Sequence, residues 1–258
     1  KFVMLYAICL AICIDYAFGW PNRFISFIGH PVILIGKAIS WFEKNLNYGS
    51  KRRKVLCGGC STIFLIAMFY SFAFLIEKYT FAYTDGWTTV VTMAIIMWPW
   101  LAIKSMHIHI SNILVPLSNH KIEEARYELS MIVGRNTANL DENEISRSAI
   151  ESLAENTSDG VIAPLFWCVV LGLPGLFAYK VINTADSMIA YKSERFKDYG
   201  LIAAKIDDAV NYIPARLTAV LYSLVGLAPN KIRGLRHDAN LHRSPNAGWP
   251  EGMVARLL

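Results

Sequence analysis

Charged residues are scarce in this chain: they make up 17% of its 258 residues, whereas 54% are hydrophobic and the mean hydropathy is +0.35. This composition argues against a soluble enzyme and is typical of polytopic membrane proteins, whose expected partner is membrane lipid. The formal net charge is +5, but basic residues near membrane spans are explained by topology. We therefore expect no nucleic-acid partner.

Paired cysteine motifs and nucleotide-binding motifs are also missing. Each of the five cysteines lies in an apolar stretch, where it is expected to be a small core residue. Cys57-Gly-Gly-Cys60 has the spacing of a redox or zinc motif, but no second pair accompanies it. Gly29 and Gly36 are too far apart for a P-loop, and Ala38 stands in place of its hydroxyl residue. Zinc modules and P-loop enzymes are therefore not indicated.

Three long apolar segments are present, over residues 2–19, 55–76 and 87–103. About 20 helical residues cross roughly 30 Å of hydrocarbon, so each segment predicts a membrane-spanning helix. Two further segments, 161–182 and 213–229, contain glycine and proline and either span or re-enter the membrane. The first segment has no Ala-x-Ala cleavage signal and is expected to be retained.

The positions of Lys and Arg predict the orientation, because basic residues remain on the cytoplasmic side. Five crossings leave 17 basic residues inside and 6 outside, whereas three crossings leave 23 inside and 2 outside. Three crossings fit better and make 161–182 a re-entrant hairpin, broken at Gly172-Leu-Pro-Gly175. We predict an all-α polytopic protein of the cytoplasmic membrane, with one membrane domain over 1–258. Its functional loops, including a helical region over 104–160, then face the cytoplasm.

Two helix signals lie within the region 104–160. Apolar residues recur every three or four positions from His120 to Val133, so one face of a helix can pack there. Asp141-Glu-Asn-Glu144 has the form of a capping box and predicts the start of a second helix.

One polar phrase flanks the segment 161–182, as Asn156-Thr-Ser-Asp159 before it and Asn183-Thr-Ala-Asp186 after it. Glu151 and Glu155 are four residues apart and share a helix face that leads into the first phrase. Such faces are usually solvated, but a carboxylate that approaches lipid needs a partner, which Mg²⁺ would supply. Helix capping by the Asn and Asp side chains is an equally good explanation of the phrases.

A second polar run follows Asp186. Its arginines can grip phosphate or carboxylate with a planar fork, and its lysines supply mobile point charges. Adjacent acids on a helix project in different directions, so Asp207 and Asp208 need not serve one ion. The run contains Lys192, Arg195, Asp207, Asp208 and Arg216.

The order and spacing of several phrases resemble the membrane-bound adenosylcobinamide-phosphate synthases of cobalamin biosynthesis, the CobD/Cbib family. The phrases that carry this resemblance are His30-Pro31-Val32, Gly134-Arg-Asn-Thr137, Ala154-Glu-Asn-Thr-Ser-Asp-Gly160, Asn183-Thr-Ala-Asp-Ser-Met188, Tyr191-Lys192, Glu194-Arg195, Asp207-Asp208, Pro214-Ala-Arg-Leu217 and Ser244-Pro-Asn-Ala-Gly-Trp-Pro-Glu251.

The resemblance implies an ATP-dependent amide synthase that joins adenosylcobyric acid, a corrinoid substrate, to aminopropanol or its phosphate, with ATP as co-substrate and Mg²⁺ as cofactor. The catalytic residues that it implies are Glu155, Asp159, Asp186 and Arg195. The implied metal ligands are Glu151, Glu155, Asp159 and Asp186. Substrate or phosphate binding is implied for Arg135, Asn156, Asn183, Lys192, Asp207, Asp208, Arg216 and Asn246.

The sequence departs from the family pattern at three positions. Asn136 stands where the family usually has Asp, Ala190 where it has Gly, and Trp20 where an early Asp is usual. Asn136 removes a carboxylate near the expected site. A membrane sensor or transporter without catalytic activity is the alternative, because broken helices beside polar phrases also occur in transporters. A homo-oligomer is compatible with the sequence.

Overall fold

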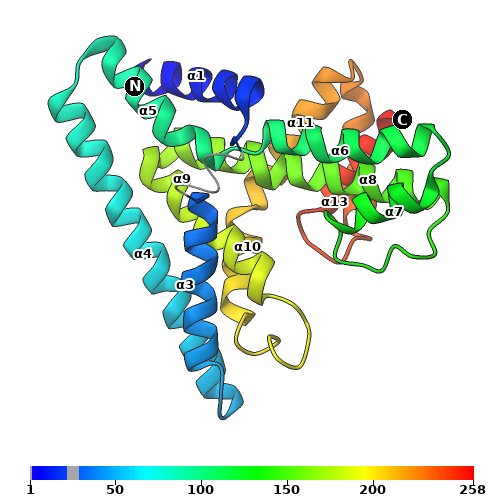
Figure 1. Ribbon diagram of the computed structural model, residues 1–258, viewed down its shortest axis with the longest axis horizontal. Coiled ribbons are helices and arrows are strands. Elements are labelled where there is room, and N and C mark those ends of the chain that lie inside the picture. Colours follow the sequence, from blue (N-terminus) through cyan, green and yellow to red (C-terminus); the bar gives the residue numbers. More distant parts are fainter. Residues whose placement is uncertain (1, 22–28) are drawn as a thin grey trace. The chain divides into compact units, whose positions relative to one another are not determined.

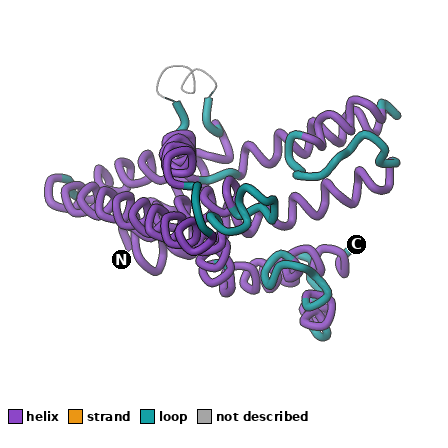
Figure 2. The backbone as a smooth tube through the Cα atoms, turned by 90° about the horizontal axis from the view of Figure 1, so that it is seen from below, coloured by secondary structure: helices purple, strands orange, loops and turns teal. Residues whose placement is uncertain are grey.

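The computed structural model describes residues 2–21 and 29–258, and helices are the only regular elements in these ranges (Figures 1 and 2). The predicted all-α class is therefore confirmed. The α-helices are α1 Phe2–Phe18, α3 Pro31–Leu46, α4 Lys51–Tyr83, α5 Gly86–Met97, α6 Ile103–Ser118, α7 Ile122–Ser130, α8 Glu142–Thr157, α9 Ala163–Ile189, α10 Leu201–Val210, α11 Tyr212–Val225, α12 Leu235–Ala239 and α13 Gly248–Leu257. The short 3₁₀ helices are η1 Trp98–Trp100 and η3 Pro229–Ile232, and η2 Ser158–Ile162 is π-helical.

Among the residues that the structure describes, three helices are long and apolar enough to cross a membrane: Lys51–Tyr83, Gly86–Ser118 and Glu142–Ile189. The first two contain the predicted spans 55–76 and 87–103, and the third contains the segment 161–182. The predicted span 2–19 and the segment 213–229, predicted to span or re-enter the membrane, correspond to shorter apolar helices, α1 with 17 residues and α11 with 14. The polytopic membrane class is supported, whereas the number of crossings stays a prediction.

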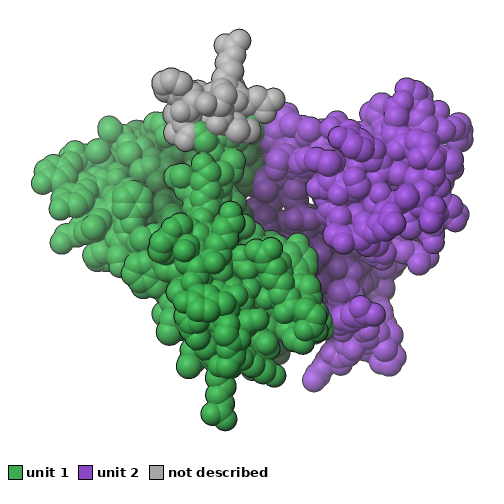
Figure 3. Space-filling model, turned by 60° about the horizontal axis from the view of Figure 1, so that its bottom comes forward, with its two compact units in different colours: residues 1–101, 163–212 green, residues 102–162, 213–258 purple. Residues whose placement is uncertain are grey.

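The chain forms two compact units, coloured separately in Figure 3. Unit 1 comprises residues 1–101 and 163–212, and unit 2 comprises residues 102–162 and 213–258. The helical region predicted over 104–160 falls within unit 2, and the two Asn-Thr-x-Asp phrases fall in different units.

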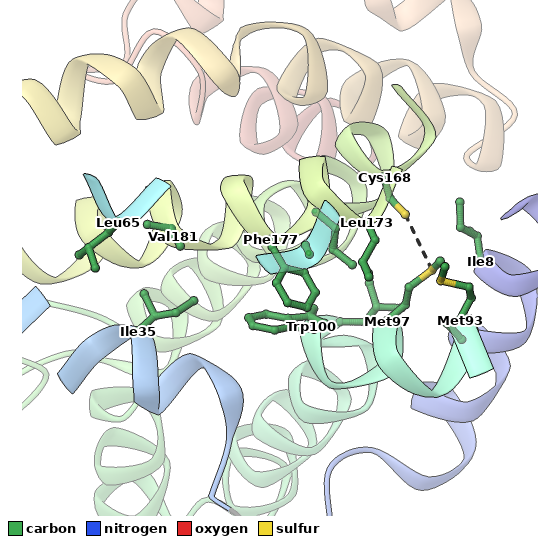
Figure 4. Packing of buried hydrophobic residues seen from close by; sticks show 14 of the residues in the cluster. Ile8, Ile35, Leu65, Met93, Met97, Trp100, Cys168, Leu173, Phe177 and Val181 are labelled. Atoms are coloured by element: carbon green, nitrogen blue, oxygen red, sulfur yellow. Dashed lines mark hydrogen bonds between the residues drawn. The ribbon is translucent and has the colours of Figure 1, made fainter. Parts of the chain in front are cut away.

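Unit 1 is organised around the pairing of α4 with α9, against which α3 and α10 also pack. Apolar side chains from α5, η1 and α9 fill its core (Figure 4). The Trp100 and Phe177 rings lie 4.2 Å apart between centroids, and the Cys168 Sγ atom lies 3.8 Å from Met97 Sδ. Aromatic and sulfur contacts of this kind add to the stability from burial alone.

The cysteines do not all lie in this core. Cys168 is buried as predicted, but Cys9, Cys13 and Cys60 are exposed, so the predicted core position is wrong for these three. They lie on α1 and α4, whose outward faces carry large apolar side chains. Exposure on such a helix is compatible with contact to lipid, because the bilayer solvates apolar side chains.

The two glycines of Cys57-Gly-Gly-Cys60 have a packing role. A Cβ atom added at Gly58 would overlap the Tyr199 carbonyl oxygen, and one at Gly59 would lie 3.1 Å from Ile202 Cγ1. The Ser61 and Tyr199 hydroxyls share a hydrogen bond of 2.9 Å beside this contact. The motif therefore lets α4 approach the start of α10 closely, as small residues do between membrane helices.

Helix α9 is broken at Gly172, which has φ 73° and ψ −160°, a backbone conformation that suits glycine. A Cβ atom added at Gly175 would overlap the carbonyl oxygen of Trp167. In a straight helix these residues would be about 12 Å apart, so the chain folds sharply back at the predicted break.

A carboxylate of α4 accepts a hydrogen bond from the backbone at this break. Glu77 Oε2 accepts a hydrogen bond of 2.6 Å from the Leu173 backbone N–H. This N–H belongs to the first residue after the break, and Pro174 follows it in the position that proline favours at a helix start. Glu77 therefore satisfies a donor that the interrupted helix leaves without an internal acceptor.

Unit 2 contains two small cores. One joins α6, α7 and α8 through Ile113, Ala125, Leu129, Ile145 and Ala149. Both helix signals are confirmed: α7 spans Ile122–Ser130, and the capping box opens α8 with reciprocal hydrogen bonds between Asp141 and Glu144. The other core brings α11, α12 and α13 together.

Labelling of single cysteines will test the predicted re-entrant hairpin. In a background without the native cysteines, Asn143→Cys and Ser193→Cys should react with an impermeant maleimide from the same side, the cytoplasmic one. Tyr83→Cys, whose position at the end of α4 is 80% exposed, should react from the opposite side. Labelling of Asn143→Cys and Ser193→Cys from opposite sides would show that the segment crosses the membrane.

The close approach at Gly58 predicts a cost for any side chain there. Gly58→Ala should destabilise the protein by about 1–3 kcal/mol, because overpacking forces backbone to move. Gly134→Ala is the matched control, since an added Cβ at Gly134 meets no atom within 4 Å. Thermal unfolding in detergent measures both, and equal melting temperatures for the two variants would contradict the packing role.

Candidate functional site

A polar cavity of about 440 Å³ lies in unit 2, and we call it the glutamate cavity. Helix α8, the segment before it, and the C-terminal part of the unit supply its walls. Its lining residues are Ile132, Val133, Gly134, Arg135, Ser148, Glu151, Ser152, Glu155, Asn156, His242 and Glu251. The predicted residues Arg135, Glu151, Glu155 and Asn156 are therefore brought together here.

Hydrogen bonds hold several of these side chains in place. Arg135 Nη2 donates to Ser148 Oγ at 2.6 Å and to Glu151 Oε2 at 2.9 Å. His242 Nε2 lies 3.3 Å from Glu251 Oε2. The cavity wall thus alternates acidic with basic groups, which is typical of a site for a polar ligand.

Glu251 is the most perturbed acid of the cavity. Its pKa is raised to about 8, mainly by burial and also by the charges of Glu155 and Glu151, against the opposing effect of Arg135. Its side chain is 16% exposed. Groups with perturbed pKa values concentrate at functional sites. Glu251 is not among the predicted site residues, although it ends the last phrase of the family resemblance.

A second cavity of about 710 Å³ adjoins the first, because Glu151, His242 and Glu251 line both. Arg147 of α8 and Asp238 of α12 add charge to it. Both volumes lie within the range of about 300–1,000 Å³ that is usual for small-molecule sites.

Two predicted phosphate-binding residues of unit 2 are neighbours. Arg216 Nη1 lies 3.4 Å from Asn246 Oδ1, and its guanidinium lies 4.6 Å from the centre of the Trp249 ring. Stacking of this kind orients the planar arginine fork. Asn246 itself is buried, with its backbone N–H bonded to Ser244 Oγ.

A second group of polar residues lies in unit 1, and we call it the aspartate cluster: Tyr179, Asn183, Asp186, Asp207 and Asn211. Tyr179 Oη donates to Asn211 Oδ1 at 2.9 Å, and Asn211 Nδ2 donates to Asp207 Oδ2 at 2.9 Å. Helices α9 and α10, which carry the cluster, pack against each other. Asn183 and Asp186, two further predicted residues on α9, lie near enough to Asp207 to change the pKa of its carboxyl group.

The carboxylates of this cluster influence each other. The pKa of Asp207 is raised to about 7, mainly by burial and also by the charge of Asp186. Hydrogen bonding by the Asn211 and Asn183 side chains offsets part of this rise. A shift of this size marks a candidate functional group. Asp208 is exposed on the next position of α10.

Arg195, a predicted catalytic residue, forms an ion pair with Glu43. Its Nε and Nη2 atoms donate to the two carboxylate oxygens of Glu43, at 2.9 and 2.7 Å. Asn47 donates to Glu43 Oε1 and to the Arg195 carbonyl oxygen as well. This bidentate pair ties the segment after α9 to the end of α3. Glu43 and Arg195 lie about 150 residues apart in the sequence, so the spacing of residues could not predict this ion pair.

The remaining predicted residues are dispersed. Asn156 Nδ2 donates to the Ser152 carbonyl oxygen at 2.8 Å, on the rim of the glutamate cavity. Asp159 lies on η2, a π-helical turn of a kind that often marks functional positions. Lys192 is exposed in the segment after α9. Asp159 and Asp186 belong to different units.

A preformed metal site is not evident: within residues 2–21 and 29–258, no three His, Cys, Asp or Glu side chains are grouped to hold an ion. Mg²⁺ is often bound by only one or two carboxylates together with substrate phosphates. The two carboxylates of the aspartate cluster, one with a buried oxygen atom that accepts no hydrogen bond, fit that second mode.

Comparisons with known proteins cover almost the whole chain. The profile of a family described as CobD/Cbib protein matches residues 8–258. Cobalamin biosynthesis protein CobD of Rhodobacter capsulatus is 44% identical over 252 residues, which are 96% of this chain and 78% of the relative. The protein of the same name from Brucella suis is 46% identical, over 99% of this chain and 80% of the relative. That from Halalkalibacterium halodurans is 39% identical, over 98% and 79%. No solved structure matches.

The Glu43–Arg195 pair predicts a pH-dependent stability. The hydrogen bonds from Arg195 hold the pKa of Glu43 below its ordinary value of 4.5. Such a lowered pKa stabilises the fold above the unfolded-state value, and the effect is lost as pH falls through the folded-state value. Arg195→Ala should therefore lower the melting temperature by roughly 2–4 °C at pH 7, and by progressively less below pH 4.5.

Lys197→Ala is the matched control, because it removes an exposed pair with Glu194, which is worth little. A melting temperature of Arg195→Ala equal to that of the wild type, with activity lost, would instead support the predicted catalytic role.

Proposed function

Because the chain belongs to the CobD/Cbib family of cobalamin biosynthesis proteins, we propose that it is an ATP-dependent amide synthase. It joins a propionate carboxylate of adenosylcobyric acid to the amine of aminopropanol or of aminopropanol phosphate. The observation that carries this proposal is the glutamate cavity, where acids and an arginine from three phrases of the family resemblance converge.

The reaction requires activation of the carboxylate, because a carboxylate oxygen is a poor leaving group at neutral pH. In the first step this oxygen attacks the γ-phosphorus of ATP, which gives an acyl phosphate and ADP. The amine nitrogen then attacks the acyl carbon, the C–O bond to phosphate breaks, and inorganic phosphate leaves. The ammonium form of the amine must lose a proton before it attacks, and the resulting amide nitrogen loses a second one.

The glutamate cavity suits the amine. Glu151 and Glu155 attract the ammonium group, and Glu251 accepts its proton. A pKa of about 8 for Glu251 is close to the operating pH, which is where a general base works best. A small amine fits a cavity of about 440 Å³, whereas a corrin ring with its side chains does not, so the ring lies outside this cavity and only its propionate arm reaches the amine.

Basic groups bind the phosphates in this proposal. In unit 2, Arg216, with Asn246 beside it, and Arg135 present forks to phosphate oxygens. Lys192, exposed in unit 1, offers a mobile charge to phosphate there. Mg²⁺, when bound, offsets the charge that develops on the transferred phosphoryl group. Asp186 would hold this ion, and Asn183, on the same helix, would orient the groups next to it. Asp159, in unit 2, would orient ligand groups there.

A direct assay tests the proposal. Protein purified in detergent is incubated with adenosylcobyric acid, Mg·ATP and either aminopropanol or its phosphate, and the products are analysed by mass spectrometry. We expect the amide product together with ADP and phosphate. Binding of the corrinoid without turnover would favour the sensor or transporter alternative.

Removal of the base should reduce the rate with little change in binding. Glu251→Gln should lower kcat by about 10²–10⁴-fold, the usual contribution of a general base. Glu124→Gln is the control, since Glu124 is exposed and paired with Lys121 on the surface of unit 2. Wild-type kcat in Glu251→Gln would refute this role of Glu251 while leaving the reaction itself in place.

A further inference from the structure

Two helix faces of unit 1 each present one carboxylate and one amide. Asn183 and Asp186 lie three residues apart on α9, and Asp207 and Asn211 lie four apart on α10. Residues at these spacings are neighbours on a helix surface. Because α9 and α10 pack together and the two aspartates influence each other, the four side chains form one oxygen-rich group on rigid elements.

Asp207 shows that this group is incomplete. The residue is only 9% exposed, and its Oδ1 atom is buried without any hydrogen-bond partner. A buried acceptor left unsatisfied costs about 1–3 kcal/mol, and more when it is charged. An unsatisfied group of this kind in a folded protein indicates a functional role or a bound ion.

The surrounding hydrogen bonds fix the orientation of this carboxylate. The Tyr179 hydroxyl donates to Asn211 Oδ1, so the Asn211 amide must turn its Nδ2 atom to Asp207 Oδ2. A carboxylate held by one oxygen leaves the other available for a ligand. Tyr179 is itself only 2% exposed, so packing locks the start of this chain of hydrogen bonds.

The chemistry of the group selects its ligand. Two carboxylates repel a phosphate or another anion, which argues against the phosphate-binding role first expected for Asp207. A hard divalent cation prefers such oxygen ligands and keeps waters that substrate phosphates can replace. We infer that Asp186 and Asp207 together bind one divalent cation of the Mg²⁺ class, with Tyr179 and Asn211 as positioning residues.

The role of the cation rests on the proposed function, because a phosphoryl transfer needs a divalent cation. Binding of the cation, however, can be measured without the reaction. Titration of the detergent-solubilised protein with Mn²⁺, followed by electron paramagnetic resonance, reports bound and free ion in the absence of ATP and corrinoid. The wild type should show one Mn²⁺ site that Mg²⁺ displaces.

Variants locate the site. Asp207→Asn keeps an oxygen to accept from Asn211 and should weaken Mn²⁺ binding by at least about tenfold, as should Asp186→Asn. Tyr179→Phe should weaken it by about 10-fold, because outer-shell partners of metal ligands have effects of that size. Glu194→Gln, which changes a side chain that is 90% exposed in the same unit, should bind like the wild type. Circular dichroism shows that each variant is folded.

Each outcome separates the inference from the proposed function. Turnover with unchanged Mn²⁺ affinity in Asp207→Asn would overturn the cation site and leave the synthase standing. A further outcome is a wild type that binds Mn²⁺ but forms no product, with the binding lost in Asp207→Asn and Asp186→Asn. That result would support the cation site and refute the synthase. A wild-type protein that binds no Mn²⁺ would overturn the inference directly.

Discussion

Carboxylates removed from water need a compensating partner, and this constraint shapes most of the polar structure of this apolar chain. Glu77 meets the constraint with the Leu173 backbone N–H, and Glu43 meets it with the guanidinium of Arg195. Asp207 and Glu251 meet it only in part, and the pKa of each is raised. The distinction separates acids that fix the fold from acids that remain available for chemistry.

The acids with a full partner, Glu77 and Glu43, lie at other places in unit 1 than Asp207. Glu77 and Glu43 stabilise unit 1 at two connections, the break within α9 and the segment that leads from α9 to α10. The aspartate cluster lies on the helices that these two connections join. The fold therefore places a rigid frame around the cluster, and rigid elements are what a binding site needs to hold its ligands in one geometry.

Local signals in the sequence predicted local structure well. The Gly172 break, the capping box at Asp141 and the helix α7 each depend on a few neighbouring residues, and each was predicted from them. The pairing of Glu43 with Arg195 and the approach of Tyr199 to Gly58 join distant segments, and no periodicity reveals such contacts. The glutamate cavity was found in part, because Glu151 and Glu155 share one helix face, whereas Glu251 comes from the other end of unit 2.

The hydrogen bond from Leu173 to Glu77 has an electrostatic consequence. A helix that starts inside an apolar segment presents the positive end of its dipole there, equivalent to about half an elementary charge. In transporters with broken helices, such ends attract the anionic groups of the substrate. Here the carboxylate of Glu77 already neutralises the helix end that follows Gly172. With this N–H already bonded to a carboxylate, the break should attract a phosphate less than an open helix start does, and it acts as a structural bend.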